Sequence, residues 1–193
     1  MSLWTAASLP QRVDAPNGLT FVPLTPALVE ADYAAVVRDI PMLRAWSGQD
    51  WPTDDFPIEW NLEDLQRHDR EQREGVALTY SVLIDGVVQG CIYVRPLVDA
   101  LATREVLLPV GVAEAGGTVV RGWLHDRPAA DLIDATTGWL LAEGLVHGRL
   151  WWQTNSQCPD QLAACDALGL TDTIELAGED RTWVLRSAVS GVS

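Results

Sequence analysis

The dipeptide Asp85-Gly86 stands between two β-rich runs and is the feature that most constrains the fold of this chain. The runs, residues 76–84 and 87–94, are rich in β-branched and aromatic residues. An Asp-Gly pair supplies the positive φ angles that a two-residue type I′ turn requires, and such a turn joins antiparallel strands. The sequence therefore predicts a β-hairpin here.

Upstream of this hairpin, the sequence predicts one strand and two helices. The strand covers residues 19–24, and Thr25-Pro26 then starts a helix, because proline is tolerated at the first helical position. Pro41 is expected to end that helix. The second helix is mostly polar and expected at the surface, with Asn61 as its cap and its end near Glu74. The first helix should bury apolar residues at helical spacing: Val29, Tyr33, Val36, Val37 and Ile40.

Downstream of the hairpin, strands and helices alternate. A helix that crosses between two strands makes them parallel, whereas a tight turn makes them antiparallel. The order is therefore that of an α/β (α+β) protein with a mixed sheet. Residues 96–117 are ambiguous, and residues 106–112 within them could add a strand. The other expected elements are strands at 118–124, 149–154, 170–176 and 181–186, with helices from Pro128 to about Glu143 and over 159–168.

The division into domains follows from the same pattern. Residues 1–18 are expected to be an irregular N-terminal lead-in, residues 19–187 a single domain, and residues 188–193 a flexible tail. We find no internal repeat and no low-complexity block.

An acidic excess limits the partners of this chain. Its 193 residues include 27 acidic and 13 basic side chains, a net charge of −14. Nucleic acids and anionic membranes require a basic surface, so neither is expected as a partner. A cationic or neutral small molecule suits the charge better. No apolar run approaches the ~18–20 residues of a membrane span, and the first residues lack a secretory signal, so we expect a cytoplasmic protein.

The cysteines and histidines predict neither a disulfide framework nor a metal site. Three cysteines, an odd number, stand at positions 91, 158 and 165, without a zinc-type spacing. His68 and His147 are expected at the surface. With His125 and the cysteines they form no credible set of metal ligands, so no metal is predicted.

Three segments resemble the GNAT N-acetyltransferase superfamily: LTFVPLTPALVEADYAAVV, ALTYSVLIDGVVQGCIYV and CPDQLAACDALGL. The order of elements over nearly all of residues 19–187 resembles that superfamily too. The resemblance implies a GNAT-like acyl-CoA N-acyltransferase fold, with a mostly antiparallel sheet, a splayed parallel pair of strands and helices on both faces. It also implies acetyl-CoA as co-substrate, with its pyrophosphate on the backbone N–H groups that begin the next helix.

The resemblance places the cofactor at the end of strand 118–124 and in the loop that follows it. The family pattern there, Gln/Arg-x-x-Gly-x-Gly/Ala, is not kept, because this loop has no glycine. The negative charges of Asp126 and Asp131 disfavour the binding of an anion here, whereas the positive charge of Arg127 favours it. The residues implied to bind the cofactor are Trp123, Leu124, His125, Arg127, Ala129 and Ala130, with Asn155 beside the pantetheine arm.

The resemblance also suggests catalytic residues. The family often carries a glutamate base on the strand that here lacks a carboxylate, and Glu114 lies upstream of that strand. Counting four residues back from Gly169 places Cys165 where the family has a tyrosine acid. A thiol could protonate the departing thiolate. The alternative is that Cys165 is a small buried core residue.

Residues 46–60 combine tryptophans with carboxylates, and the resemblance implies that this segment shapes the acceptor side. Aromatic faces and carboxylates suit a cationic amine, and the proposed substrate-binding residues are Trp46, Trp51, Asp55 and Trp60. The alternative is a lid whose tryptophans pack inward while its acids face water. Trp151 and Trp152 point to opposite sides of their strand. One should lie in the core and the other at the cleft or a subunit contact, which leaves a homodimer open.

Two functions follow from these observations. The first is an N-acetyltransferase that moves an acetyl group from acetyl-CoA to a primary amine of a small substrate, in a direct ternary complex. The second is a catalytically inactive GNAT-fold module that binds a ligand or partner, which the missing glycines and Cys165 favour.

Overall fold

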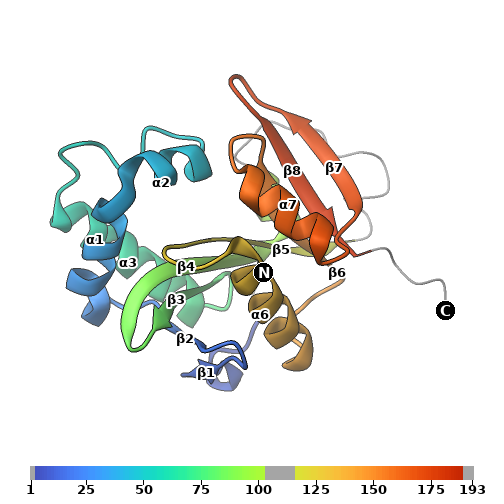
Figure 1. Ribbon diagram of the computed structural model, residues 1–193. Coiled ribbons are helices and arrows are strands. Elements are labelled where there is room, and N and C mark those ends of the chain that lie inside the picture. The colour runs from blue at the N-terminus through green and yellow to red at the C-terminus, as the bar shows by residue number, and fades with distance from the viewer. Residues whose placement is uncertain (1–2, 103–115, 189–193) are drawn as a thin grey trace. The chain divides into compact units, whose positions relative to one another are not determined.

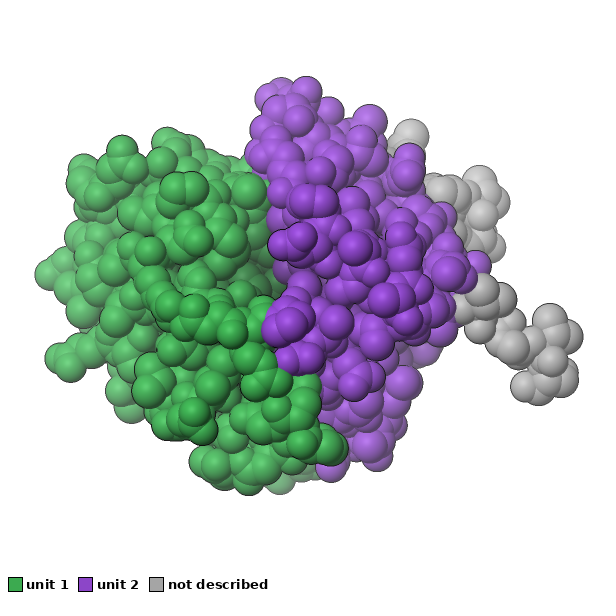
Figure 2. Space-filling model, in the orientation of Figure 1, with its two compact units in different colours: residues 1–93, 122–127 green, residues 94–121, 128–193 purple. Residues whose placement is uncertain are grey.

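A computed structural model describes residues 3–102 and 116–188. The chain divides into two compact units, each built from two stretches of sequence (Figure 2). Unit 1 comprises residues 1–93 and 122–127, and unit 2 comprises residues 94–121 and 128–193. Among the described residues, no helix has both the length and the apolar character needed to cross a membrane.

Unit 1 contains the strands β1 (Val13–Asp14), β2 (Leu19–Pro23), β3 (Leu78–Ile84) and most of β4 (Val87–Pro96), in that order (Figure 1). β2 pairs antiparallel with both β1 and β3. The β3–β4 hairpin confirms the turn prediction, because Asp85 has a φ of 50° and Gly86 a φ of 81°. The strand expected at 19–24 is also confirmed, whereas β1 was not predicted.

The helices of unit 1 are α1 (Val29–Val36), α2 (Ile40–Ser47) and α3 (Ile58–Arg73), with short 3-10 turns at Ala6–Ser8, Pro26–Leu28 and Val37–Asp39. The prediction that Pro41 ends the first helix was wrong. Pro41 lies in the first turn of α2, and the Asp39 side chain caps that helix by accepting a hydrogen bond from the Met42 N–H at 3.0 Å. The helix that starts after Pro26 ends before Pro41.

The prediction for the second helix needs two corrections. α3 begins at Ile58, so Asn61 lies inside the helix and does not cap it. One face of α3 is buried, although its residues are mostly polar. α3 packs on α1 and β3 (Figure 1), and that contact covers Asn61, Leu65, His68 and Gln72.

Unit 2 begins with the end of β4 and the helix α4 (Leu97–Ala102), which was not predicted. The other elements confirm the expected order: β5 (Gly117–Leu124), α6 (Ala129–Ala142), β6 (Arg149–Asn155), α7 (Pro159–Ala167), β7 (Asp172–Ala177) and β8 (Thr182–Ser187). The last residues of β5 belong to unit 1. The possible strand at 106–112 lies outside the described residues.

The strands of unit 2 follow the order β5-β6-β8-β7. β5 and β6 are parallel, while β8 runs antiparallel to both β6 and β7. The predicted mixed α/β fold, mostly antiparallel with one parallel pair, is therefore confirmed. Trp151 and Trp152 are both buried within the chain. Trp151 belongs to an apolar core with Leu97, Leu101, Val119, Leu176, Trp183 and Leu185.

Candidate functional site

The parallel pairing of β5 with β6 is short. It runs from Gly117–Arg149 to Val120–Trp152. β5 continues to Leu124 and β6 to Asn155, yet in the described part of the chain the pairing of these two strands stops there. On its other side β6 remains paired with β8 up to Asn155. The ladder between β5 and β6 thus ends at Trp152, three residues before the end of β6.

The loop after β5 is fixed to other parts of unit 1. The His125 backbone N–H donates to the Gln89 carbonyl at 2.8 Å, and its Nε2 lies 3.0 Å from the Ala35 carbonyl oxygen. The Arg127 guanidinium donates to the Asn17 carbonyl at 3.2 Å. His125 is buried and meets the Trp123 ring edge to face. These contacts fix the course of the chain just before α6.

α6 begins directly after this loop. Pro128, with a φ of −57°, is its N-cap, and Ala129 is its first residue. The first backbone N–H groups of a helix have no partner within the helix, so Ala129 and Ala130 present small side chains and available donors. Asp126 is paired with Arg38 at 2.6 Å, which offsets its negative charge, while Asp131 lies in the first turn of α6.

Asn155 and Cys165 both take structural positions in unit 2. Asn155 is completely buried, and its Oδ1 accepts a hydrogen bond from the Gln157 N–H at 2.8 Å, which forms the turn between β6 and α7. Cys165 is buried in α7, and burial raises the pKa of its thiol to about 12. This placement favours the packing interpretation of Cys165. Glu114, the expected base, lies outside the described residues.

The aromatic residues expected on the acceptor side separate into two groups. Phe56 contacts the rings of Trp51 and Trp60 edge to face, at 5.9 and 6.4 Å. Trp60, in the first turn of α3, is 56% exposed, and Asp55 is exposed in the loop before that helix. Trp46 is buried in α2 with its ring 5.7 Å from that of Tyr93. Trp51 and Trp60 thus share Phe56 as a neighbour, while Trp46 packs against Tyr93.

Side chains of α1 and α2 fix the loop between α2 and α3. Arg44 donates to the Pro52 carbonyl at 2.9 Å and pairs with Asp54 at 2.8 Å. The Tyr33 hydroxyl donates to the Phe56 carbonyl at 2.8 Å. The exposed ring of Trp60 and the Asp55 carboxylate thus stand on an anchored part of the chain.

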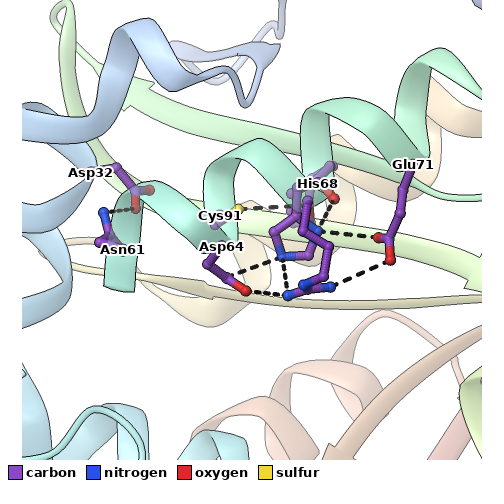
Figure 3. A network of polar contacts seen from close by, with 9 residues as sticks. Asp32, Asn61, Asp64, His68, Glu71 and Cys91 are labelled. Atoms are coloured by element: carbon purple, nitrogen blue, oxygen red, sulfur yellow. Dashed lines mark hydrogen bonds and ion pairs between the residues drawn. The ribbon is translucent and has the colours of Figure 1, made fainter. Parts of the chain in front are cut away.

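A network of buried polar side chains between α1, α3 and β4 was not predicted from the sequence (Figure 3). Asp32 from α1 is 4% exposed, and its Oδ2 accepts a hydrogen bond from the Asn61 Nδ2 at 3.0 Å. Burial raises the pKa of Asp32 to about 6, although the hydrogen bond from Asn61 partly opposes this. A buried carboxyl group that titrates near neutral pH is typical of functional sites.

His68 lies at the centre of the second half of this network (Figure 3). Its side chain stands between Asp64 and Glu71, with ring nitrogens 3.3 and 3.5 Å from their carboxylates, and Thr79 Oγ1 lies 3.1 Å from Nδ1. Burial alone would lower the pKa of His68, but the two carboxylates outweigh it and raise that pKa. For Asp64 the directions are reversed. Burial would raise its pKa, but the interactions with His68 and Arg67 outweigh burial and lower that pKa to about 2. The expectation that His68 lies at the surface was wrong, whereas His147 is exposed as expected.

The spacing of polar residues in α3 could have indicated this network. Asn61, His68 and Gln72 recur at helical spacing with Leu65 and so share one face of the helix. Among the described residues, no group of three or more His, Cys, Asp or Glu side chains is arranged to hold a metal ion.

No protein-family model matches this chain, and no curated protein matches it in sequence. Solved structures do match. The acetyltransferase MccE, which confers self-immunity to microcin C7 and was solved with acetyl-CoA and AMP, has a TM-score of 0.68 at 10% identity, with 94% of this chain and 98% of that one covered. The chain has the GNAT N-acetyltransferase fold.

Two further structures with this fold contain coenzyme A. The ribosomal alpha-N-protein acetyltransferase RimL, in complex with coenzyme A, has a TM-score of 0.66 at 13% identity over 91% of this chain and 96% of that one. Mycobacterium smegmatis RimJ, in complex with a CoA disulfide, has a TM-score of 0.66 at 14% identity over 93% of this chain and 86% of that one. These matches confirm the GNAT fold that the sequence resemblance implied.

Proposed function

We propose that this protein is an N-acetyltransferase that moves an acetyl group from acetyl-CoA to a primary amine. One observation carries the proposal: in a chain with the GNAT fold, the parallel β5–β6 pairing ends at Val120–Trp152 while both strands continue. An extended ligand such as a pantetheine arm can bind at the edge of a sheet where the ladder between two strands ends.

The residues at the start of α6 fit a pyrophosphate. The N–H groups of Ala129 and Ala130 are donors at the positive end of a 14-residue helix, and their methyl side chains leave room for close approach. Arg127 adds a positive charge next to them. Bound acetyl-CoA supplies an electrophilic thioester carbonyl. Trp123, Leu124 and His125 would hold the chain that leads to these donors, and Asn155 would hold the turn after β6.

For the acceptor we propose a small cationic amine. Trp60 and Trp51 offer aromatic faces, and Asp55 offers a carboxylate in the loop that precedes α3. The net charge of −14 attracts cations. In the reaction the amine nitrogen forms a bond to the acetyl carbon, the carbon–sulfur bond breaks, the amine loses a proton, and the sulfur leaves as the thiol. Glu114 remains our proposal for the group that accepts the proton.

Proton donation by Cys165 is less favourable. A thiol whose pKa is raised to about 12 is a weaker acid than an ordinary thiol near ~8.5. It would therefore be a poor donor to a departing thiolate. Solvent or the amine itself can supply that proton instead.

The proposal is tested by thermal melting with acetyl-CoA, followed by assays of thiol release with small amines. A ligand at about 100 times its Kd should stabilise the fold by ~2.7 kcal/mol. Ala129→Asp and Ala130→Asp should weaken binding, because each adds a negative charge at the start of α6. Ala163→Asp, at an exposed position of α7, is the matched control and should leave binding unchanged. An unchanged melting temperature at millimolar acetyl-CoA would contradict the proposal.

The alternative is a GNAT-fold module that binds without catalysis, favoured by the buried Cys165 and by the absence of glycine in the loop after β5. It predicts binding of coenzyme A without release of thiol from acetyl-CoA for any amine. The two assays therefore separate the two functions.

A further inference from the structure

Arg38 joins three segments of unit 1 through two charged or polar contacts. It lies in the 3-10 turn Val37–Asp39, between α1 and α2. Its Nη2 donates to Asp126 Oδ2 at 2.6 Å, and its Nη1 donates to Gln89 Oε1 of β4 at 2.6 Å. Arg38 thus connects the loop after β5 with β4 and with the helical region near the N-terminus.

The residue that Arg38 holds has an unusual backbone conformation. Asp126 has a φ of 60°, in the left-handed region that glycine adopts freely and other residues adopt at a cost. The neighbours on both sides are anchored too, His125 to the Gln89 and Ala35 carbonyls and Arg127 to the Asn17 carbonyl. Three consecutive side chains therefore fix this loop to three different parts of unit 1.

The charge of Asp126 also matters for the helix that follows. Asp126 stands three residues before Ala129, the first residue of α6. An unpaired carboxylate so close along the chain would repel an anion at the helix start, because like charges in proximity oppose binding. The guanidinium of Arg38 offsets that charge and at the same time holds the left-handed turn.

We propose that Arg38 is a positioning residue for anion binding at the start of α6, acting through Asp126. This inference rests on the proposed function, because the anion is the pyrophosphate of coenzyme A. The loop lacks the glycines of the family pattern. Asp126 takes the left-handed conformation in this loop, where Arg38 holds it and offsets its charge.

The test is a double-mutant cycle on the Kd of coenzyme A, measured by calorimetry on the full chain. Arg38→Ala should weaken binding about tenfold, since it leaves the Asp126 carboxylate unpaired. Asp126→Gly in the Arg38→Ala background should restore the Kd to within about twofold of wild type, because glycine accepts a positive φ and carries no charge. Arg12→Ala is the control. It removes a comparable exposed ion pair, with Asp14 at 2.7 Å, and should leave the Kd unchanged.

Hydrogen exchange without any ligand gives a second readout. Residues 125–131 should exchange faster in Arg38→Ala than in wild type, while the unfolding free energy stays nearly the same, because exposed ion pairs contribute only about 0–1 kcal/mol. With acetyl-CoA as the varied substrate, Arg38→Ala should raise KM for acetyl-CoA and leave kcat close to wild type.

Two results would overturn the inference while leaving the proposed function intact: an unchanged Kd in Arg38→Ala, or no recovery when Asp126→Gly is added. If wild type itself fails to bind coenzyme A, the proposed function fails and this inference fails with it. The exchange data would then report only whether Arg38 holds the loop.

Discussion

Asn61 donates a hydrogen bond from Nδ2 to Oδ2 of Asp32 at 3.0 Å, and both side chains are almost completely buried. The pair joins α3 to α1 inside unit 1. Because burial raises the pKa of Asp32 to about 6, the folded protein holds an ionised carboxylate away from water at neutral pH. Such an arrangement opposes stability.

Replacing Asp32 should therefore stabilise the protein at neutral pH. The raised pKa means that the folded state binds the Asp32 proton more tightly than the unfolded state does. Protonation of Asp32 therefore stabilises the folded state fully below about pH 4, and this stabilisation is lost as the pH rises through 6. Asp32→Asn keeps the shape and removes the charge. Urea unfolding should show it to be more stable than wild type by up to about 3 kcal/mol at pH 7.5, with little gain at pH 4. The exposed Asp134→Asn should change little at either pH, and an equal effect of Asp32→Asn at both pH values would contradict this account.

His68 should show the opposite effect on stability. It is 3% exposed and stands between two half-buried carboxylates that Arg67 also contacts, so His68→Ala removes charged hydrogen bonds and should cost about 2 kcal/mol at pH 6. The raised pKa of His68 makes its contribution complete below about pH 6.5, and the contribution is lost as the pH rises through the raised value. The cost of His68→Ala should therefore shrink by pH 9. His147→Ala, at an exposed position, is the matched control. A cost that does not depend on pH would rule out the ion pair.

Gly90 marks a close approach of β4 to the end of β5 within unit 1. A Cβ placed there would overlap the carbonyl oxygen of Trp123 and lie 3.0 Å from Leu124 Cα. Gly90→Ala should therefore destabilise the protein by about 1–3 kcal/mol, since a backbone must shift to accept the methyl group. Gly138 in α6 has open space around it, so Gly138→Ala should be neutral or stabilising. Thermal melting compares the two, and equal melting temperatures would show that β4 does not need a glycine at this position.

Cys165 should be unreactive in the folded protein. With its pKa raised to about 12 by burial, almost no thiolate forms at pH 8, and the side chain has no exposed surface. Iodoacetamide at pH 8 should leave Cys165 unmodified until denaturant is added, as read by mass spectrometry. Cys165→Ala should retain turnover of acetyl-CoA. A loss of turnover with an unchanged melting temperature would return Cys165 to the list of catalytic residues.

The elements that could be predicted from the sequence are those determined by local chemistry. Asp85-Gly86 specifies the hairpin turn through its positive φ angles, and Pro128 starts α6 because proline suits a helix start. Pro41 was misinterpreted because a proline can end one helix or begin the next. The Asp39 cap decides between the two, and its hydrogen bond to the Met42 N–H is visible only in three dimensions.

The parts of the site that escaped prediction depend on contacts between distant residues. A polar face on α3 normally indicates solvent exposure, and only the partners Asp32 and Thr79 make burial of Asn61 and His68 favourable. The loop after β5 was likewise expected from a family pattern alone. Its anchoring through Arg38 joins positions far apart in sequence, which no local pattern predicts.

Hydrogen exchange with and without acetyl-CoA tests the central claim most directly. The claim is that acetyl-CoA binds where the β5–β6 pairing ends and α6 begins. At about 1 mM acetyl-CoA, at the upper end of ordinary KM values, exchange should slow in residues 121–131 and 153–155 and stay unchanged in α3. Unchanged exchange in both of those segments would contradict the claim.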